Sequence, residues 1–142
     1  MQKTSWTGRL VLAACALAFS ACGGATLTDP TTTPSPLRTT DTFTGTLTPR
    51  GANYHLFAMQ APGDVDVVLT KTGPLATIVL GLGISQTSAG QCIPVLLLNN
   101  NTVQAGGGIS GTTTDTGPYC VAVYDIGNVA DSVTYTVTVT HP

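Results

Sequence analysis

The chain has 142 residues, of which 42% are hydrophobic and only 8% are charged, and it contains no glutamate. Amphipathic helices with charged outer faces are excluded by this scarcity of charge, and the abundance of Thr, Val and Gly favours an all-β fold. Beyond residue 22, seven aspartates against three basic residues leave a net charge of −4, which excludes a basic surface for nucleic acid.

Residues 1–21 have the pattern of a cleaved export signal. Lys3 and Arg9 make the start basic, and residues 10–21 are apolar or small. A membrane-spanning helix needs about 20 apolar residues, whereas a signal peptide has an apolar core of about 7–15 residues that ends in small residues. We therefore predict a signal peptide over 1–21, with a buried core helix as the alternative.

Two cysteines compete for the processing site. Residues 12–15, LAAC, match the lipobox of bacterial lipoproteins in side chains but leave a short apolar core, whereas residues 19–22, FSAC, resemble it at the right distance. We predict that Cys22 becomes the lipid-bearing N-terminus, with simple cleavage after Ser20 as the alternative. Gly23 follows, and by resemblance to Gram-negative lipoproteins this implies the outer membrane of the cell envelope. Several acyl chains make such an anchor durable.

Residues 22–40 are predicted to be a tether between the lipid and a folded domain. Three prolines interrupt this Thr-rich segment, and it has few apolar residues and no periodicity. Such composition is typical of a semi-extended linker. Fully extended, it reaches on the order of 60 Å, enough to lift a domain off the membrane.

Residues 41–142 are predicted to form one domain of short strands separated by Gly, Pro and Asn turns. This spacing predicts an all-β fold, a two-sheet antiparallel β-sandwich or a barrel. Glycines and β-branched residues favour strand over helix at 76–84, and Pro94 indicates a strand start or an edge. The first five predicted strands are 42–47, 54–59, 65–70, 76–84 and 93–98. After them we expect a turn at 99–101, a hairpin partner at 102–105, and a loop or weak strand at 106–115.

The clearest signal lies at the C-terminus, where residues 117–128 and 132–142 are predicted to form a hairpin. In the second segment Val and Tyr alternate with Thr, as in a strand with one covered face. In the first segment, residues 119–124 are apolar on both faces, which favours a central strand.

Four segments carry a resemblance to a known family. They are 43–47, FTGTL; 57–63, FAMQAPG; 117–125, GPYCVAVYD; and 135–137, YTV. Across nearly all of 41–142 the chain resembles the bacterial pre-peptidase C-terminal domain. The resemblance implies a jelly-roll-like two-sheet sandwich of the kind appended to secreted hydrolases, usually without catalytic residues of its own.

Cys92 and Cys120 remain once Cys15 is removed with the signal and Cys22 is acylated. In an exported domain an isolated pair of cysteines predicts a disulfide. Two reduced thiols in the core are the alternative.

No motif predicts catalysis. Asp115-Thr116-Gly117 matches the tripeptide of aspartic peptidases, but one copy lacks the second carboxylate, and a turn before Pro118 explains it. His55 and His141 are the only imidazoles, and neither stands in a metal-ligand or nucleophile motif. We predict a protein that is not an enzyme and has no cofactor and no metal site.

Two binding functions are weighed against this prediction. Asp64 and Asp66 share a strand face and Asp41 lies near the tether, but calcium needs 6–8 oxygen ligands. Sugar sites favour exposed aromatic rings; Trp6 is removed with the signal, and the four tyrosines are expected to pack at sheet edges. We therefore predict a non-catalytic surface or periplasmic lipoprotein, an interaction or structural module whose partner is an unknown protein or polysaccharide. A carbohydrate- or calcium-binding accessory module is the alternative.

Overall fold

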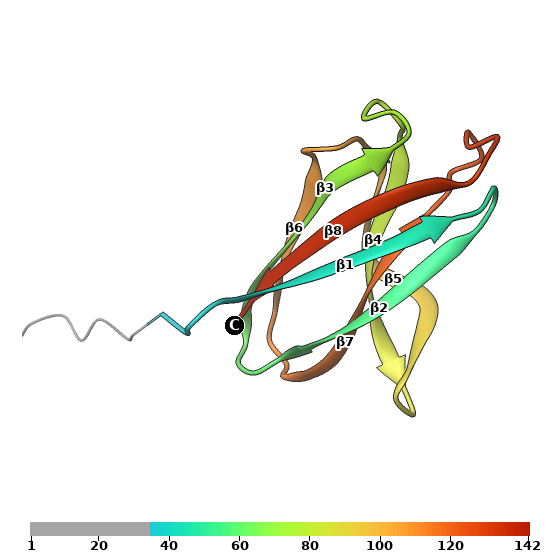
Figure 1. The fold of residues 1–142 in the computed structure, drawn as a ribbon. Coiled ribbons are helices and arrows are strands. Elements are labelled where there is room, and N and C mark those ends of the chain that lie inside the picture. The colour runs from blue at the N-terminus through green and yellow to red at the C-terminus, as the bar shows by residue number, and fades with distance from the viewer. Residues whose placement is uncertain (1–34) are drawn as a thin grey trace, which may run out of the picture. The chain divides into compact units, whose positions relative to one another are not determined.

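A computed structural model describes residues 35–142, which form eight β-strands and no helix (Figure 1). Within this range, nothing resembles an apolar helix long enough to cross a membrane. The predicted signal peptide, the lipid site at Cys22 and the tether as far as residue 34 lie outside the described residues and stay predictions. The strands are β1 (Thr39–Leu47), β2 (Ala52–Met59), β3 (Gly63–Gly73), β4 (Leu80–Ser88), β5 (Gln91–Val103), β6 (Gly108–Thr113), β7 (Gly117–Tyr124) and β8 (Val133–His141).

The strands form two antiparallel four-stranded sheets packed face to face, which confirms the predicted β-sandwich. Sheet A has the order β1-β8-β3-β6, and sheet B has the order β2-β7-β4-β5. Every connection except the one between β4 and β5 changes sheet, and this strand order is that of an eight-stranded jelly roll. Most strand pairs therefore join distant parts of the chain, as where Thr39 lies opposite His141.

The core lies between the sheets and follows the period-2 patterns of the sequence. On β8 the alternation is as predicted, because Val133, Tyr135, Val137 and Val139 are buried while the threonines between them face outward. Val65, Val67 and Leu69 of β3 are fully buried beside them. Burial of these branched side chains supplies the main favourable term in folding.

The two-faced apolar character of residues 119–124 is explained by their place in sheet B. Strand β7 lies between β2 and β4, as predicted for a central strand. Tyr119, Val121 and Val123 face the core, whereas Cys120 and Ala122 lie on the opposite side of the sheet. Both are nevertheless fully buried, so the outer face of sheet B is covered at this point.

The predicted C-terminal hairpin is wrong, because β7 belongs to sheet B and β8 to sheet A. Residues 125–132 carry the chain from one sheet to the other, and β8 pairs with β1 and β3 instead. Period-2 alternation identifies the buried face of a strand but not its neighbour, so the pattern at 133–139 is equally compatible with either sheet.

Two further boundaries differ from the prediction. Residues 74–79 carry the chain between the sheets, so that the strand predicted at 76–84 begins only at Leu80. Residues 99–101 are not a turn but part of one long edge strand, β5, which contains Pro94 as expected of an edge. The asparagines stay in the strand because side-chain bonds satisfy them: Tyr124 donates to Asn101 Oδ1, and Thr102 donates twice to Asn100 Oδ1.

The predicted disulfide joins Cys92 of β5 to Cys120 of β7, with 5.8 Å between their Cα atoms. Strand β4 lies between these two strands in the sheet, and its Ser85 pairs with Cys120. The bond therefore joins the start of β5 to β7 across the outer face of sheet B. It also helps to cover the outward side of β7.

Candidate interaction surfaces

The outer face of sheet A carries an ordered array of hydroxyl groups, here called the hydroxyl face. Because apolar side chains of β1 and β8 point to the core, the threonines between them point outward. The antiparallel register sets them opposite one another, and the Oγ1 atoms of Thr40 and Thr140 are 2.8 Å apart. The four cross-strand pairs are Thr40 with Thr140, Thr42 with Thr138, Thr44 with Thr136 and Thr46 with Thr134.

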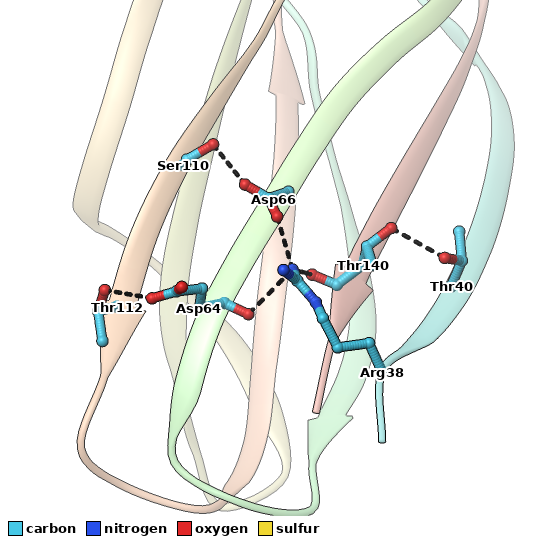
Figure 2. Close-up of polar contacts among 7 residues, drawn as sticks. All are labelled: Arg38, Thr40, Asp64, Asp66, Ser110, Thr112 and Thr140. Atoms are coloured by element: carbon cyan, nitrogen blue, oxygen red, sulfur yellow. Dashed lines mark hydrogen bonds and ion pairs between the residues drawn. The ribbon is translucent and has the colours of Figure 1, made fainter. Parts of the chain in front are cut away.

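Arg38 crosses the end of this face, as Figure 2 shows. Its Nη2 atom donates to Asp66 Oδ2 at 2.6 Å and to the backbone carbonyls of Thr140 at 2.9 Å and Asp64 at 3.2 Å. One guanidinium thus joins the segment before β1 to β3 and β8. Residues 38–40 belong to the fold, and β1 begins at Thr39, two residues before the start of the predicted domain.

The two aspartates of β3 lie on one face, as their spacing predicted, and both are held by protein donors. Ser110 Oγ donates to Asp66 Oδ1 at 2.5 Å, and Thr112 Oγ1 donates to Asp64 Oδ1 at 2.6 Å (Figure 2). Ser110 first and then Arg38 stabilise the ionised form of Asp66 and hold its pKa below the usual range. Within residues 35–142, no group of three or more acidic, histidine or cysteine side chains is placed to hold a metal.

A shallow hollow of about 330 Å³ lies on the same face, farther from Arg38. Four threonines and one charged residue, Lys71, line it. The threonines are Thr44, Thr46, Thr134 and Thr136. The backbone at Gly45 also borders the hollow. On the inner side of the sheet a Cβ at this position would collide with the hydroxyl of Tyr135, so the missing side chain of Gly45 leaves space in the core for the Tyr135 ring.

His55 lies between the sheets rather than in a reactive site. Its Nε2 is 2.7 Å from the Tyr135 hydroxyl, and its ring stacks on Phe43 with 4.9 Å between the centroids. Burial lowers the pKa of His55 from its ordinary 6.5, which favours a neutral ring at neutral pH. Burial also raises the pKa of Tyr135.

His141 is buried near the other end of the sandwich. Its Nε2 lies 3.1 Å from Asp41 Oδ2, and its ring packs against Phe57 with 5.1 Å between centroids. In the part of the chain that the structure describes, the hydrogen bonds of both imidazoles go to Tyr135, Asp41 and a backbone carbonyl, and none goes to a serine hydroxyl. The two histidines therefore have structural partners.

The remaining candidate residues do not converge on one site. Asp115 lies in the exposed connection between β6 and β7, as expected of a turn. Tyr119 and Tyr135 are buried, and the most exposed aromatic side chain of residues 35–142 is Tyr54, at 36%. The face of sheet A is therefore lined by hydroxyls rather than by a row of aromatic rings.

Asp125 organises the loop between β7 and β8. Its Oδ2 accepts the Arg50 N–H at 2.7 Å, and its Oδ1 accepts the N–H groups of Gly127, Asn128 and Val129 at 2.8, 3.1 and 3.2 Å. Gly127 has a φ of +96°, a conformation that favours glycine. Burial opposes ionisation, but the four backbone donors outweigh it and hold the pKa of Asp125 below its usual range.

Sequence reasoning missed Arg38 and the acceptor role of Asp125. The acidic partner of Arg38, Asp66, is 28 residues away, and Thr140 is 102 residues away. Local pattern carries no signal for contacts of this range. Asp125 followed by Gly127 is a recognisable turn signal, but its bond to Arg50 spans 75 residues.

No family model matches the chain, and no curated protein matches it. Among solved structures it is similar to the crystal structure of Aeromonas hydrophila PliG, described as a periplasmic lysozyme inhibitor of g-type lysozyme. The chains are 17% identical with a TM-score of 0.50, over 70% of this chain and 83% of the other. At this identity the likeness shows a shared fold alone. The resemblance to the pre-peptidase C-terminal domain stays a prediction.

Proposed function

We propose that this protein is an exported, non-catalytic module that binds another protein through the hydroxyl face. The single observation that carries the proposal is the array of four threonine pairs on β1 and β8. Ordering a long, flexible side chain at an interface costs about 0.5–1.5 kcal/mol. Threonine has one stiff χ1 angle, so a threonine face loses little freedom when a partner covers it.

The chemistry of the face fits a polar protein surface. Each hydroxyl both donates and accepts hydrogen bonds, so the array adapts to backbone and side-chain groups of either kind. The charges at its end are already paired within the chain, because Arg38 and Ser110 hold Asp66. A partner therefore meets few unpaired charges that it would have to desolvate.

The solved neighbour lends support from outside the chain. It is described as an inhibitor of g-type lysozyme, and such a protein acts by contact with another protein. A sandwich of this fold thus serves in binding rather than in chemistry in at least one case.

We propose that the module is displayed on the cell envelope by a lipid on Cys22. The export signal and the lipobox-like FSAC segment support this anchor. A mature chain purified from cell envelopes is expected to begin at Cys22 and to carry the mass of several acyl chains. A mature N-terminus at Ala21, without added mass, would show that the chain is cleaved and released instead.

The hydroxyl face is tested by crosslinking in intact cells that export the chain, followed by mass spectrometry. Thr44→Arg places a long charged side chain within the array, and Thr114→Arg makes the same change in the exposed connection between β6 and β7. We expect Thr44→Arg to reduce the yield of the crosslinked partner about tenfold, a loss of about 1.4 kcal/mol.

Thr114→Arg serves as the matched control and is expected to retain the partner at the wild-type level. Both variants are first shown to unfold at the wild-type urea midpoint, so that lost stability does not imitate lost binding. Equal recovery of the same proteins by all three chains, or no protein crosslinked to any of them, would contradict the proposal.

A further inference from the structure

A pocket of about 280 Å³ opens at the end of the sandwich opposite to the one that residues 35–38 enter. The register defines this distal end, because Leu47 pairs with Val133 there while Thr39 pairs with His141 at the entry end (Figure 1). The pocket lies between residues 74–79 and the loop before β8. The pocket thus lies at the end of the sandwich away from residues 35–38.

The wall of the pocket is mainly aliphatic. Ile78 and Val129 are partly buried and pack against the hydrophobic core, and Val133 at the back is buried. Pro74 and Val79 complete this wall. Asp131 is the only charged residue among those that line the pocket, and its side chain is exposed.

Hydrogen bonds hold both loops in place without a ligand. The Asp125 carboxylate accepts three N–H groups from residues 127–129, which shapes the loop that carries Val129 and Asp131. On the other side, Thr72 Oγ1 donates to the Leu75 carbonyl at 2.7 Å and Gln104 donates to the Thr77 carbonyl at 3.3 Å. The cost of ordering the loops on binding is therefore low.

We propose that this pocket binds a basic side chain, arginine or lysine, of a partner protein. Such a side chain lays its aliphatic stem along apolar surface and keeps its cationic head at the rim, which matches an aliphatic wall beside one carboxylate. At about 280 Å³ the pocket lies at the small end of the range of ligand pockets, about 300–1,000 Å³, and it has room for one long side chain. The net negative charge of the chain also favours the approach of a partner with basic side chains.

The inference rests on the proposed function only in taking the occupant to be part of a protein. It is tested directly with a small probe, N-acetyl-arginine methylamide, added to the ¹⁵N-labelled chain from Gly23 onward. We expect saturable amide shifts confined to residues 74–79 and 127–133. The citrulline counterpart has the same shape without charge, and we expect it to bind about fivefold more weakly, as an exposed ion pair of up to about 1 kcal/mol implies.

Two variants separate this site from general attraction to an acidic protein. Asp131→Asn is expected to bind the arginine and citrulline probes equally. Asp115→Asn makes the same change at the entry end and is expected to keep the wild-type preference. The amide spectrum of each variant also reports directly whether it is folded.

Three results would overturn the inference: no saturable shift at these loops up to about 50 mM probe, equal binding of both probes to the wild-type chain, or an unchanged preference in Asp131→Asn. None of them bears on the hydroxyl face, because the crosslinking comparison of Thr44→Arg with Thr114→Arg is independent of the pocket. If Thr44→Arg and Thr114→Arg crosslink equally while the arginine probe still binds at the pocket, the proposal for the hydroxyl face is rejected. The proposal for the pocket then stands.

Discussion

Removing the disulfide between Cys92 and Cys120 is expected to lower the free energy of unfolding by about 3–4 kcal/mol. The bond closes a loop across a sequence separation of 28 residues, and in the chain-entropy model a loop of this size restricts the unfolded chain by about that amount. For a domain of about 100 residues the midpoint of thermal unfolding would fall by roughly 12–25 °C. Urea unfolding of the Cys92→Ala/Cys120→Ala chain measures the loss.

The loss is also expected to be uneven across the fold. Cys120 is fully buried on the outer side of β7, and the bond reaches it from the edge strand β5. Hydrogen exchange should therefore speed up first at residues 86–96, at the tip of the β4–β5 hairpin. The wild-type chain treated with a reductant is the matched control, since it breaks the bond without changing the sequence. A double variant within about 1 kcal/mol of the oxidised wild type would show that the bond adds little.

Asp125→Ala is expected to destabilise the chain by about 1–3 kcal/mol at neutral pH. The carboxylate accepts four backbone N–H groups, and the variant leaves them to solvent or without a partner. Partial exposure of the loop lets water replace some of these bonds, which places the expected loss toward the lower end. Urea unfolding measures the effect, with Asp131→Ala in the same loop expected to stay within about 0.5 kcal/mol of wild type.

The difference between wild type and Asp125→Ala is also expected to depend on pH. Because the pKa of Asp125 is lower in the folded chain than its ordinary 3.8, its ionised form stabilises the fold above that value. The stabilisation is lost as the pH falls through the lower, folded pKa. The difference should therefore be constant near neutrality and shrink in acid, at pH values below 3.8. A difference that grows on acidification would contradict this account of the carboxylate.

The faces of individual strands were predictable from the sequence because they depend on local alternation. The Val and Tyr positions of β8 are buried and its threonines face outward, as the pattern at 133–139 indicated. Residues 119–124 are apolar on both faces and form a central strand for the same reason. The pairing of the two cysteines followed from their number and the predicted export, with no need for geometry.

Strand partners and site residues were not predictable in this way. The hairpin expected at the C-terminus does not form, because residues 125–132 change sheets and β8 pairs with β1 at the other end of the chain. The three asparagines at 99–101 predict a turn from local propensity. In the structure they remain in β5, because Tyr124 and Thr102 donate hydrogen bonds to the side chains of Asn101 and Asn100. Each of these outcomes depends on a contact that local propensity does not contain.

By itself the sequence determined the class of the fold, the buried face of β8, the central place of β7 and the disulfide, and it predicts export to the cell envelope. Only the tertiary structure decided that the threonines of β1 and β8 form one continuous face, that Arg38 belongs to it, and that residues 74–79 meet residues 128–133 in a pocket. The physical reason is the range of the interactions. Side-chain alternation acts between neighbouring residues, whereas jelly-roll pairing joins segments up to 102 residues apart, and many sequence-compatible pairings compete until the core is packed.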